Sequence, residues 1–236
     1  MLPPLALSVR QPKAYLAGCL KGDACISRGH VNSIQGYIQL RVADWDFATA
    51  FSDALFYGYG RRSRPRKDER GYALVRSYNG YGRYNELLSF VPAIDDEHAA
   101  WLRGLFDSEG NVVCVPKPTK GERSWDRRVA IFSTNADALV AAQKSLDVFS
   151  IKFSIKPWIS SAGHLGTLPV MALVLVASKD NFSNFRSVVG SSIYRKQAAL
   201  DKIPGTYCAD LSQACREAQL RGVAVRKLRQ VQRGYY

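Results

Sequence analysis

The sequence has few of the residues that build disulfide frameworks or zinc sites. Five of its 236 residues are cysteine, an odd number, and no two of them form a C-x-x-C pair. A zinc site or a set of structural disulfides is therefore not expected, and reduced thiols fit a cytosol-like compartment. Only three histidines occur, at scattered positions. This scarcity argues against a histidine-based nuclease or a histidine-rich metal site.

The sequence also lacks a long apolar run. Its purest one, Pro169 to Ala177, has the length of a strand and is too short to cross a membrane. No charged-then-apolar leader opens the chain. We therefore expect a protein that is neither secreted nor embedded in a membrane. The expected location is the cytoplasm or an organelle matrix, in association with the nucleoid.

Acidic residues are scarce relative to basic ones. Thirty-three Lys and Arg stand against 20 Asp and Glu, which gives a net charge of +13 and an isoelectric point near 9.7. A folded protein this basic usually binds a polyanion, and 12 Tyr and 4 Trp supply rings that stack on bases. Nucleic acid is the first expectation, and a basic protein without such a partner is the alternative.

One short pattern occurs twice. Ala14–Ala24 and Ala100–Gly110 align without a gap, 86 positions apart. A small residue recurs at every fourth place in both copies, and an acid follows each series. As helices, the copies would each carry a narrow ridge of small side chains along which two backbones can approach closely. The small residues are Ala14, Gly18 and Gly22 in the first copy and Ala100, Gly104 and Ser108 in the second.

The acids that follow the ridges, Asp23 and Glu109, suggest a cation site. A carboxylate at the C-terminal end of a helix is disfavoured by the unpaired carbonyls and the negative end of the dipole unless a cation compensates. Paired ridges would bring both acids together with the carbonyls of Gly22 and Ser108. Such hard oxygen ligands suit Mg²⁺ or Mn²⁺. The alternative is two ordinary amphipathic helices, each followed by an acidic turn.

The elements after each motif follow the same order, which predicts an α+β protein with a duplication of about ninety residues. Each half reads as helix, two strands, helix, two strands and helix (αββαββα). In this reading Pro12 begins the first helix, and Asp44 caps a helix in half one as Thr134 or Asn135 does in half two. We expect an N-terminal half over residues 1–91, a C-terminal half over 92–205 and a basic helical extension over 206–236. The extension either braces the sheet or lies along DNA.

One predicted strand has a face suited to reading bases. In the stretch from Ile34 to Val42, apolar side chains alternate with amide, phenol and guanidinium groups. Such polar groups hydrogen-bond base edges and phosphates, although a plain solvated face is the alternative. A run of six basic residues from Arg61 to Arg70 either grips phosphates or forms a solvated hairpin loop. The candidate DNA contacts are Arg28, His30, Gln35, Tyr37, Gln39, Arg41, Arg61, Arg62, Arg64, Arg66, Lys67, Arg76, Lys117, Lys120, Arg123, Arg127 and Arg128.

The two motif copies resemble those of the LAGLIDADG homing endonucleases in their single-chain, two-motif form, over about 200 residues. Two positions depart from the motif: Lys21 stands where an acid is common, and Ala24 replaces the last glycine. The resemblance implies a monomer with pseudo-twofold symmetry, the motif helices at the interface and two antiparallel sheets forming a DNA-binding saddle. It also implies metal-dependent, site-specific cleavage of both strands of a long target, leaving 3′ overhangs.

The resemblance further implies roles for particular residues. Asp23 and Glu109 would be the metal ligands for Mg²⁺ or Mn²⁺, supported by Gly22 and Ser108, with Ca²⁺ bound but inactive. Lys179, at the end of the last strand of half two, resembles the active-site lysine, and Lys156 is the alternative. Two other functions fit the same ancestry. One is an RNA-binding splicing cofactor for an intron, and the other is a DNA-binding regulator that does not cleave.

Overall fold

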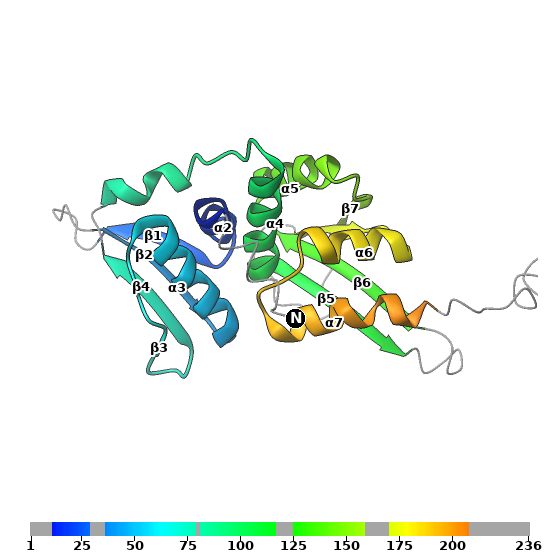
Figure 1. Cartoon of the computed structure of the whole chain (residues 1–236), viewed down its shortest axis with the longest axis horizontal. Helices are drawn as coiled ribbons and strands as arrows, with labels where there is room; N and C mark the ends of the chain where they lie inside the picture. Colours follow the sequence, from blue (N-terminus) through cyan, green and yellow to red (C-terminus); the bar gives the residue numbers. More distant parts are fainter. Residues whose placement is uncertain (1–10, 29–35, 79–80, 117–124, 159–169, 208–236) are drawn as a thin grey trace, which may run out of the picture. The chain divides into compact units, whose positions relative to one another are not determined.

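The protein is described by a computed structural model that covers residues 11–28, 36–78, 81–116, 125–158 and 170–207 (Figure 1). Internal contacts divide the chain into a unit from Met1 to Pro204 and a second from Gly205 to Tyr236. The description below concerns the first unit. Five expected DNA contacts and most of the expected extension lie outside the described residues. These five are His30, Gln35, Lys117, Lys120 and Arg123.

The two halves have the same sheet topology. Each contains a four-stranded antiparallel sheet, with strand order β1-β2-β4-β3 in the first half and β5-β6-β8-β7 in the second. The first half consists of α2 (Pro12–Cys19), β1 (Ala24–Arg28), β2 (Gly36–Val42), α3 (Trp45–Tyr59), β3 (Arg66–Lys67), β4 (Ala73–Tyr78) and the 3₁₀ helix η1 (Tyr81–Leu87). The second consists of α4 (Asp95–Glu109), β5 (Gly110–Pro116), β6 (Trp125–Ser133), α5 (Ala136–Val148), β7 (Phe153–Trp158), β8 (Val170–Leu175), α6 (Lys179–Val188) and α7 (Tyr194–Lys202). A further 3₁₀ turn, η2, spans Pro204–Thr206.

The expected α+β duplication is confirmed. One strand was not expected, and the two halves end differently. The basic run after α3 contains the two-residue strand β3, where the sequence indicated only a loop. The first half ends in the short η1, whereas the second ends in the two α-helices α6 and α7. Helix α7 contacts β5 and so brings side chains to the middle of the molecule. Among the described residues, half one has no helix that corresponds to α7.

The motif helices α2 and α4 pack against each other through their glycines (Figure 1). A Cβ added to Gly18 would overlap the carbonyl oxygen of Trp101 and lie 2.9 Å from the nitrogen of Leu105. A Cβ added to Gly104 would overlap the carbonyl oxygen of Tyr15 in the same way. The ridges of small residues therefore meet backbone to backbone, as the sequence predicts, and the ends of the two helices come together.

Each sheet has one face toward helices and one face open. In β2, Ile38, Leu40 and Val42 are buried on the helix side, where α3 packs, while the intervening side chains are more exposed. The alternation therefore has the predicted phase. No helix in the described part of the chain is long and apolar enough to cross a membrane.

The predicted helix caps lie at the predicted positions, with one difference. Asn135 accepts a hydrogen bond from the nitrogen of Ala138 at 3.1 Å and so caps α5. Asp44 precedes α3, but its side chain makes no capping bond. Its carboxylate is instead engaged by Arg195 of α7.

Candidate metal and nucleic-acid site

The ends of the two motif helices bring Asp23 and Glu109 into the same region. Asp23 follows a turn at the end of α2, in which the nitrogen of Gly22 donates to the carbonyl of Cys19 at 3.1 Å. Glu109 is the last residue of α4. A Cβ added to Gly22 would lie 2.5 Å from the Cβ of Ser108 and 2.9 Å from Oε1 of Glu109. The absence of a side chain at Gly22 therefore leaves the room that the Glu109 carboxylate occupies.

The two carboxylates lie in a setting that disfavours their negative charge. Burial, and then the charge of Asp23, raise the pKa of Glu109 from 4.5 to about 6. Burial also raises the pKa of Asp23, against the opposing charge of Lys196. Neither carboxylate has a hydrogen bond or ion pair with another residue that the structure describes. Their charge is thus uncompensated by a direct partner, which is the situation a bound cation would relieve.

The oxygen donors fit a hard divalent ion that keeps part of its hydration shell. The described residues contain no group of three or more His, Cys, Asp and Glu side chains placed to hold a metal. Two carboxylates with neighbouring backbone carbonyls form a sparse set. Mg²⁺ is commonly held in this way, by one or two carboxylates, with water and substrate phosphates completing its octahedron.

Two cavities flank the helix tips, and the internal duplication relates their walls. One, of about 300 Å³, is lined by Asp23, Ser108 and the residues from Arg41 to Asp44. The other, of about 570 Å³, is lined by Glu109, Gly22 and the residues from Phe132 to Asn135. Each acid thus opens into its own cavity, beside the small residue that precedes the other acid. The site is a pair of matched compartments.

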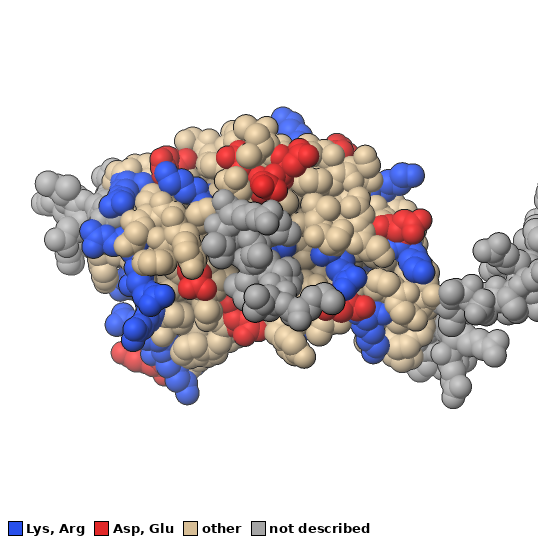
Figure 2. Space-filling view, viewed as in Figure 1, with Lys and Arg blue, Asp and Glu red and all other residues tan. Residues whose placement is uncertain are grey.

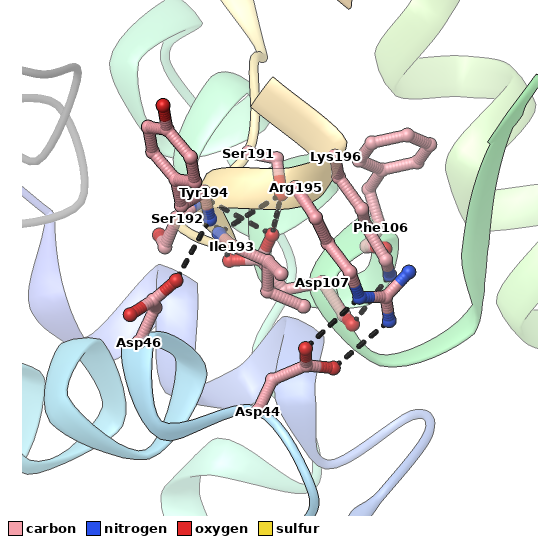
Figure 3. Close-up of polar contacts among 10 residues, drawn as sticks. All are labelled: Asp44, Asp46, Phe106, Asp107, Ser191, Ser192, Ile193, Tyr194, Arg195 and Lys196. Atoms are coloured by element: carbon pink, nitrogen blue, oxygen red, sulfur yellow. Dashed lines mark hydrogen bonds and ion pairs between the residues drawn. The ribbon is translucent and has the colours of Figure 1, made fainter. Parts of the chain in front are cut away.

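Lys196 distinguishes the Asp23 cavity from the other. It projects from α7 into the wall of the Asp23 cavity. Its ammonium donates to the carbonyl oxygens of Phe106 at 2.9 Å and Asp107 at 2.8 Å (Figure 3). Burial lowers the pKa of Lys196 from 10.5 to about 8, although nearby carboxylates, Asp107 foremost, oppose the shift. This ammonium caps the C-terminal end of α4 at the point where its carbonyls concentrate negative charge.

Asp107 anchors the segment that carries Lys196. Its buried carboxylate accepts hydrogen bonds from Ser191 Oγ at 2.6 Å and from the nitrogen of Ser192 at 3.1 Å (Figure 3). It also accepts one from Tyr15 Oη at 2.9 Å. Burial raises the pKa of Asp107, and these donors and Lys196 counter that shift. Asp107 therefore ties α2, α4 and the turn before α7 together, and so fixes where α7 begins.

Comparisons with known proteins agree with this architecture. Residues 96–190 match the family model described as LAGLIDADG-like domain. The matched region contains Glu109 and the whole β5–β8 sheet. The first half carries the other copy of the repeated pattern and the same sheet order, so both halves are built on one plan.

Solved structures share the LAGLIDADG fold at low sequence identity. Mesophilic variants of the homing endonuclease I-DmoI match with a TM-score of 0.58 and 17% identity, over 82% of this chain and 98% of that one. Full-length DUF199/WhiA from Thermatoga maritima matches with a TM-score of 0.54 and 16% identity, over 92% of this chain and 68% of that one. These likenesses establish the fold.

A curated relative is the uncharacterized protein MJ0314 of Methanocaldococcus jannaschii. It is 28% identical over 162 residues, which cover 63% of this chain. The aligned region spans 58% of that relative's length.

The two lysines named from the LAGLIDADG resemblance lie away from both acid cavities. Lys179 is the exposed first residue of α6, after the cap Ser178. Lys156 is exposed on β7, opposite Ala172 of β8. Neither lines a cavity that contains Asp23 or Glu109. Sequence reasoning missed Lys196 because α7 is brought to the motif only by folding, although its position on an otherwise basic helix was visible.

The described candidate DNA contacts divide between the faces of the sheets. Strand pairing places Tyr37, Gln39 and Arg41 with Arg76 and Arg66 on the open face of the first sheet. Arg128 lies on the open face of the second sheet, whereas Arg127 pairs with Cys114 on the face toward the helices. The other described candidates are the backbone-paired Arg28 and the exposed Arg61, Arg62, Arg64 and Lys67.

Basic side chains also gather at one end of the first half. On the face shown in Figure 2, Lys and Arg cluster over the hairpin of β3 and β4, and acidic side chains lie near the start of α4. In that hairpin Asp68 accepts from Arg41 and from the nitrogens of Arg70 and Tyr72 at 2.9 Å, so one acid shapes a turn rich in cations. A cavity of about 370 Å³ lies among these residues.

Proposed function

We propose that this protein is a metal-dependent endonuclease that cuts both strands of a specific DNA duplex. The observation that carries the proposal is the meeting of Asp23 and Glu109 at the paired tips of α2 and α4, each beside its own cavity. Structures of I-DmoI were obtained in complex with DNA and Mn, and in complex with DNA and Ca. These support DNA and a divalent ion as the partners of this fold.

The residues of the site suit phosphodiester hydrolysis. Asp23 and Glu109 would hold Mg²⁺ or Mn²⁺, with help from the carbonyls of Gly22 and Ser108. The ion would lower the pKa of a bound water and neutralise charge on the phosphate. The chain itself contributes the ammonium of Lys196, which is held beside the Asp23 cavity and can stabilise the negative charge that develops during attack. Lys196 replaces Lys179 and Lys156 in this role because of its position.

The test is cleavage of a randomised duplex library in Mg²⁺, followed by sequencing of the ends. We expect double-strand breaks with 3′ overhangs within one long recognition sequence. Asp23→Asn and Glu109→Gln should abolish double-strand cutting while DNA binding persists. Asp180→Asn, which changes an exposed acid in the first turn of α6, is the matched control and should cut normally. Undiminished cutting by Asp23→Asn or Glu109→Gln would refute the assignment.

A non-cleaving nucleic-acid binder is the second candidate, because DUF199/WhiA shares the fold over 92% of this chain. The same experiment separates the two functions. Specific retention of duplexes without breaks in Mg²⁺ or Mn²⁺ would favour the non-cleaving binder. Preferential retention of structured RNA in a parallel binding assay would favour a splicing cofactor.

A further inference from the structure

The open faces of the two sheets can be compared position by position, because the strands pair in equivalent registers. In the first sheet Val42 lies opposite Ala73, and in the second Ser133 lies opposite Met171. Counting back along both strand pairs, the position of Gln39 corresponds to Ala130, and that of Arg76 to Val174. The same duplicated framework thus carries different side chains at matched points.

The first sheet presents an organised hydrogen-bonding group. Arg76 donates to Oε1 of Gln39 through Nε at 3.0 Å and Nη2 at 2.8 Å, and to Tyr78 Oη through Nη1 at 3.2 Å. Its guanidinium also lies over the ring of Tyr37, 4.6 Å from the centroid. An arginine has five N–H donors, so two remain without a partner among the described residues. The guanidinium is thereby held in place with donors still available.

The second sheet has apolar side chains at the positions that match this group. Ala130 and Val174 stand opposite each other where Gln39 and Arg76 do in the first sheet, and Phe132 stands where Arg41 does. Phe132 and Trp158 pack edge to face, with ring centroids 4.9 Å apart. The other apolar side chains on this face are Val113, Val115, Val170 and Ala172. The same pairing places four polar residues on it, Asn111, Asp126, Ser154 and Lys156, and none of their side chains has a hydrogen bond to another described residue.

The arginine on the second face is arranged differently from Arg76. Arg128 lies over the ring of Trp158, 5.3 Å from its centroid. Its Nε is buried and has no hydrogen-bond partner among the residues that the structure describes. Among the described residues no amide or hydroxyl orients its guanidinium, whereas Gln39 and Tyr78 orient that of Arg76. Arg128 therefore packs on the aromatic pair.

These two surfaces have different capacities for reading sequence. The four base pairs differ in the major groove by their hydrogen-bond donors and acceptors, and a bidentate arginine selects guanine through O6 and N7. Apolar side chains can distinguish little more than the thymine methyl group. The second face, on which no arginine is held by other side chains among the described residues, can still follow the shape of the duplex.

We propose that base-pair specificity is concentrated in the half-site under the β1–β4 sheet, with Arg76 and Gln39 as its principal readers. The half-site under the β5–β8 sheet is bound through shape, phosphates and thymine methyl groups, and tolerates substitution. This inference rests on the proposed binding of duplex DNA and is independent of whether the DNA is then cut.

The test is selection of bound duplexes from a randomised library by the full-length chain, in Ca²⁺ and in EDTA. We expect one side of the recovered sequence to be well defined and the other degenerate. Arg76→Lys keeps the charge but cannot make the bidentate contact. It should reduce discrimination by about 5- to 150-fold at one or two positions within the defined side. Gln39→Ala should weaken the same preference by releasing the guanidinium.

Val174→Ala is the matched control, since it changes the position in the second sheet that corresponds to Arg76. It should leave sequence preference unchanged within about twofold, and thermal melting should show that all three variants are folded. Equal definition of both half-sites, or an Arg76→Lys effect that is uniform over all sequences, would overturn the inference. Selective binding without cleavage would refute the nuclease and leave the inference standing. Absence of any sequence-selective duplex binding would overturn the inference too.

Discussion

Arg195 and Asp44 form a two-point ion pair that joins α7 of the second half to the start of α3 in the first. Arg195 Nε lies 3.0 Å from Oδ1 of Asp44, and Nη2 lies 2.9 Å from Oδ2 (Figure 3). Hydrogen bonding by Arg195 lowers the pKa of Asp44. This ion pair lies beside Lys196, which is the only lysine among the described residues that lines the Asp23 cavity. The ion pair therefore also affects the position of Lys196.

Breaking this pair should cost little at neutral pH. The Arg195 side chain is 65% exposed, so the coupling free energy in a double-mutant cycle of Arg195→Ala and Asp44→Ala should be about 1 kcal/mol or less. Because the folded-state pKa of Asp44 is depressed, its contribution is present above its unfolded pKa of 3.8 and is lost as pH falls through the folded value. Urea unfolding at several pH values measures this; coupling that persists after Asp44 is protonated would contradict it.

Gly18→Ala should destabilise the protein severely. The added methyl group would overlap the Trp101 carbonyl on α4, so the two helix backbones must move apart at this point. We expect a loss of at least about 3 kcal/mol in the free energy of unfolding, measured in urea. Gly82→Ala is the control, because nothing lies within 4 Å of its added Cβ, and it should change stability by less than about 0.5 kcal/mol.

Glu109 should make the metal-free protein less stable as pH rises. Its folded-state pKa of about 6 exceeds the ordinary 4.5, so the folded state binds more protons between these values. Stability should fall as pH rises from 4.5 through 6 and stay lower above that. The shift corresponds to about 2 kcal/mol, which we reduce to about 1 kcal/mol for solvent screening of a half-buried group.

Chemical unfolding of wild type and Glu109→Gln in EDTA over this pH range would reveal the difference. The variant should lack the decline, while Glu69→Gln, which changes an exposed acid in the hairpin of β3 and β4, should behave like wild type. Parallel curves for wild type and Glu109→Gln would show that Glu109 is not the source.

Divalent ions should stabilise the folded protein through the same two acids. At a concentration 100 times the dissociation constant, Mn²⁺ or Mg²⁺ should add about 2.7 kcal/mol to the free energy of unfolding. Asp23→Asn and Glu109→Gln should each remove most of this increment while lowering the repulsion in the metal-free state. Calorimetric titration and melting in EDTA against Mn²⁺ provide the measurement. An unchanged Mn²⁺ increment in Asp23→Asn would place the ion elsewhere.

Lys196 should matter more for one strand of the target than for the other. Its ammonium lies beside Asp23, and the Glu109 cavity has instead the half-buried Lys21, which donates to the carbonyl of Leu88 at 3.4 Å. Lys196→Met should slow nicking at one strand at least tenfold, with a smaller effect on the other. Since burial lowers the pKa of Lys196 to about 8, nicking of that strand should decline as pH rises through 8.

Strand-resolved time courses, with one label on each strand, measure this asymmetry. Lys179→Met is the control and should cut both strands as wild type does, because Lys179 lines neither acid cavity. Circular dichroism should confirm that Lys196→Met is folded, as the lysine is buried. Equal slowing of both strands would count against a role confined to the Asp23 cavity.

Local patterns in the sequence were sufficient for the motif helices, for the phase of β2 and for an acid after each motif helix. The ridge of Ala14, Gly18 and Gly22 is short and repeated, and its small side chains allow two helix backbones to approach closely. It therefore predicted the contact between α2 and α4. The alternation from Ile34 to Val42 fixed the phase of β2 because a strand has a period of two. Predictions of this kind need only neighbours along the chain.

Side chains that meet across the fold were beyond those patterns. Asp44 has the sequence of a helix cap, but the arginine that engages it lies 151 positions away. The two-residue strand β3 forms because β4 lies alongside it, and Arg66 and Lys67 have little strand propensity of their own.

By itself the sequence determined that this chain is a duplicated, basic protein with an acid at the end of each motif helix, because composition and short periods are properties of the chain alone. The tertiary structure decided which lysine stands beside Asp23 and which sheet carries an organised arginine. Both depend on where α7 packs and on the register of β2 against β4, and such contacts form between residues that no local period relates.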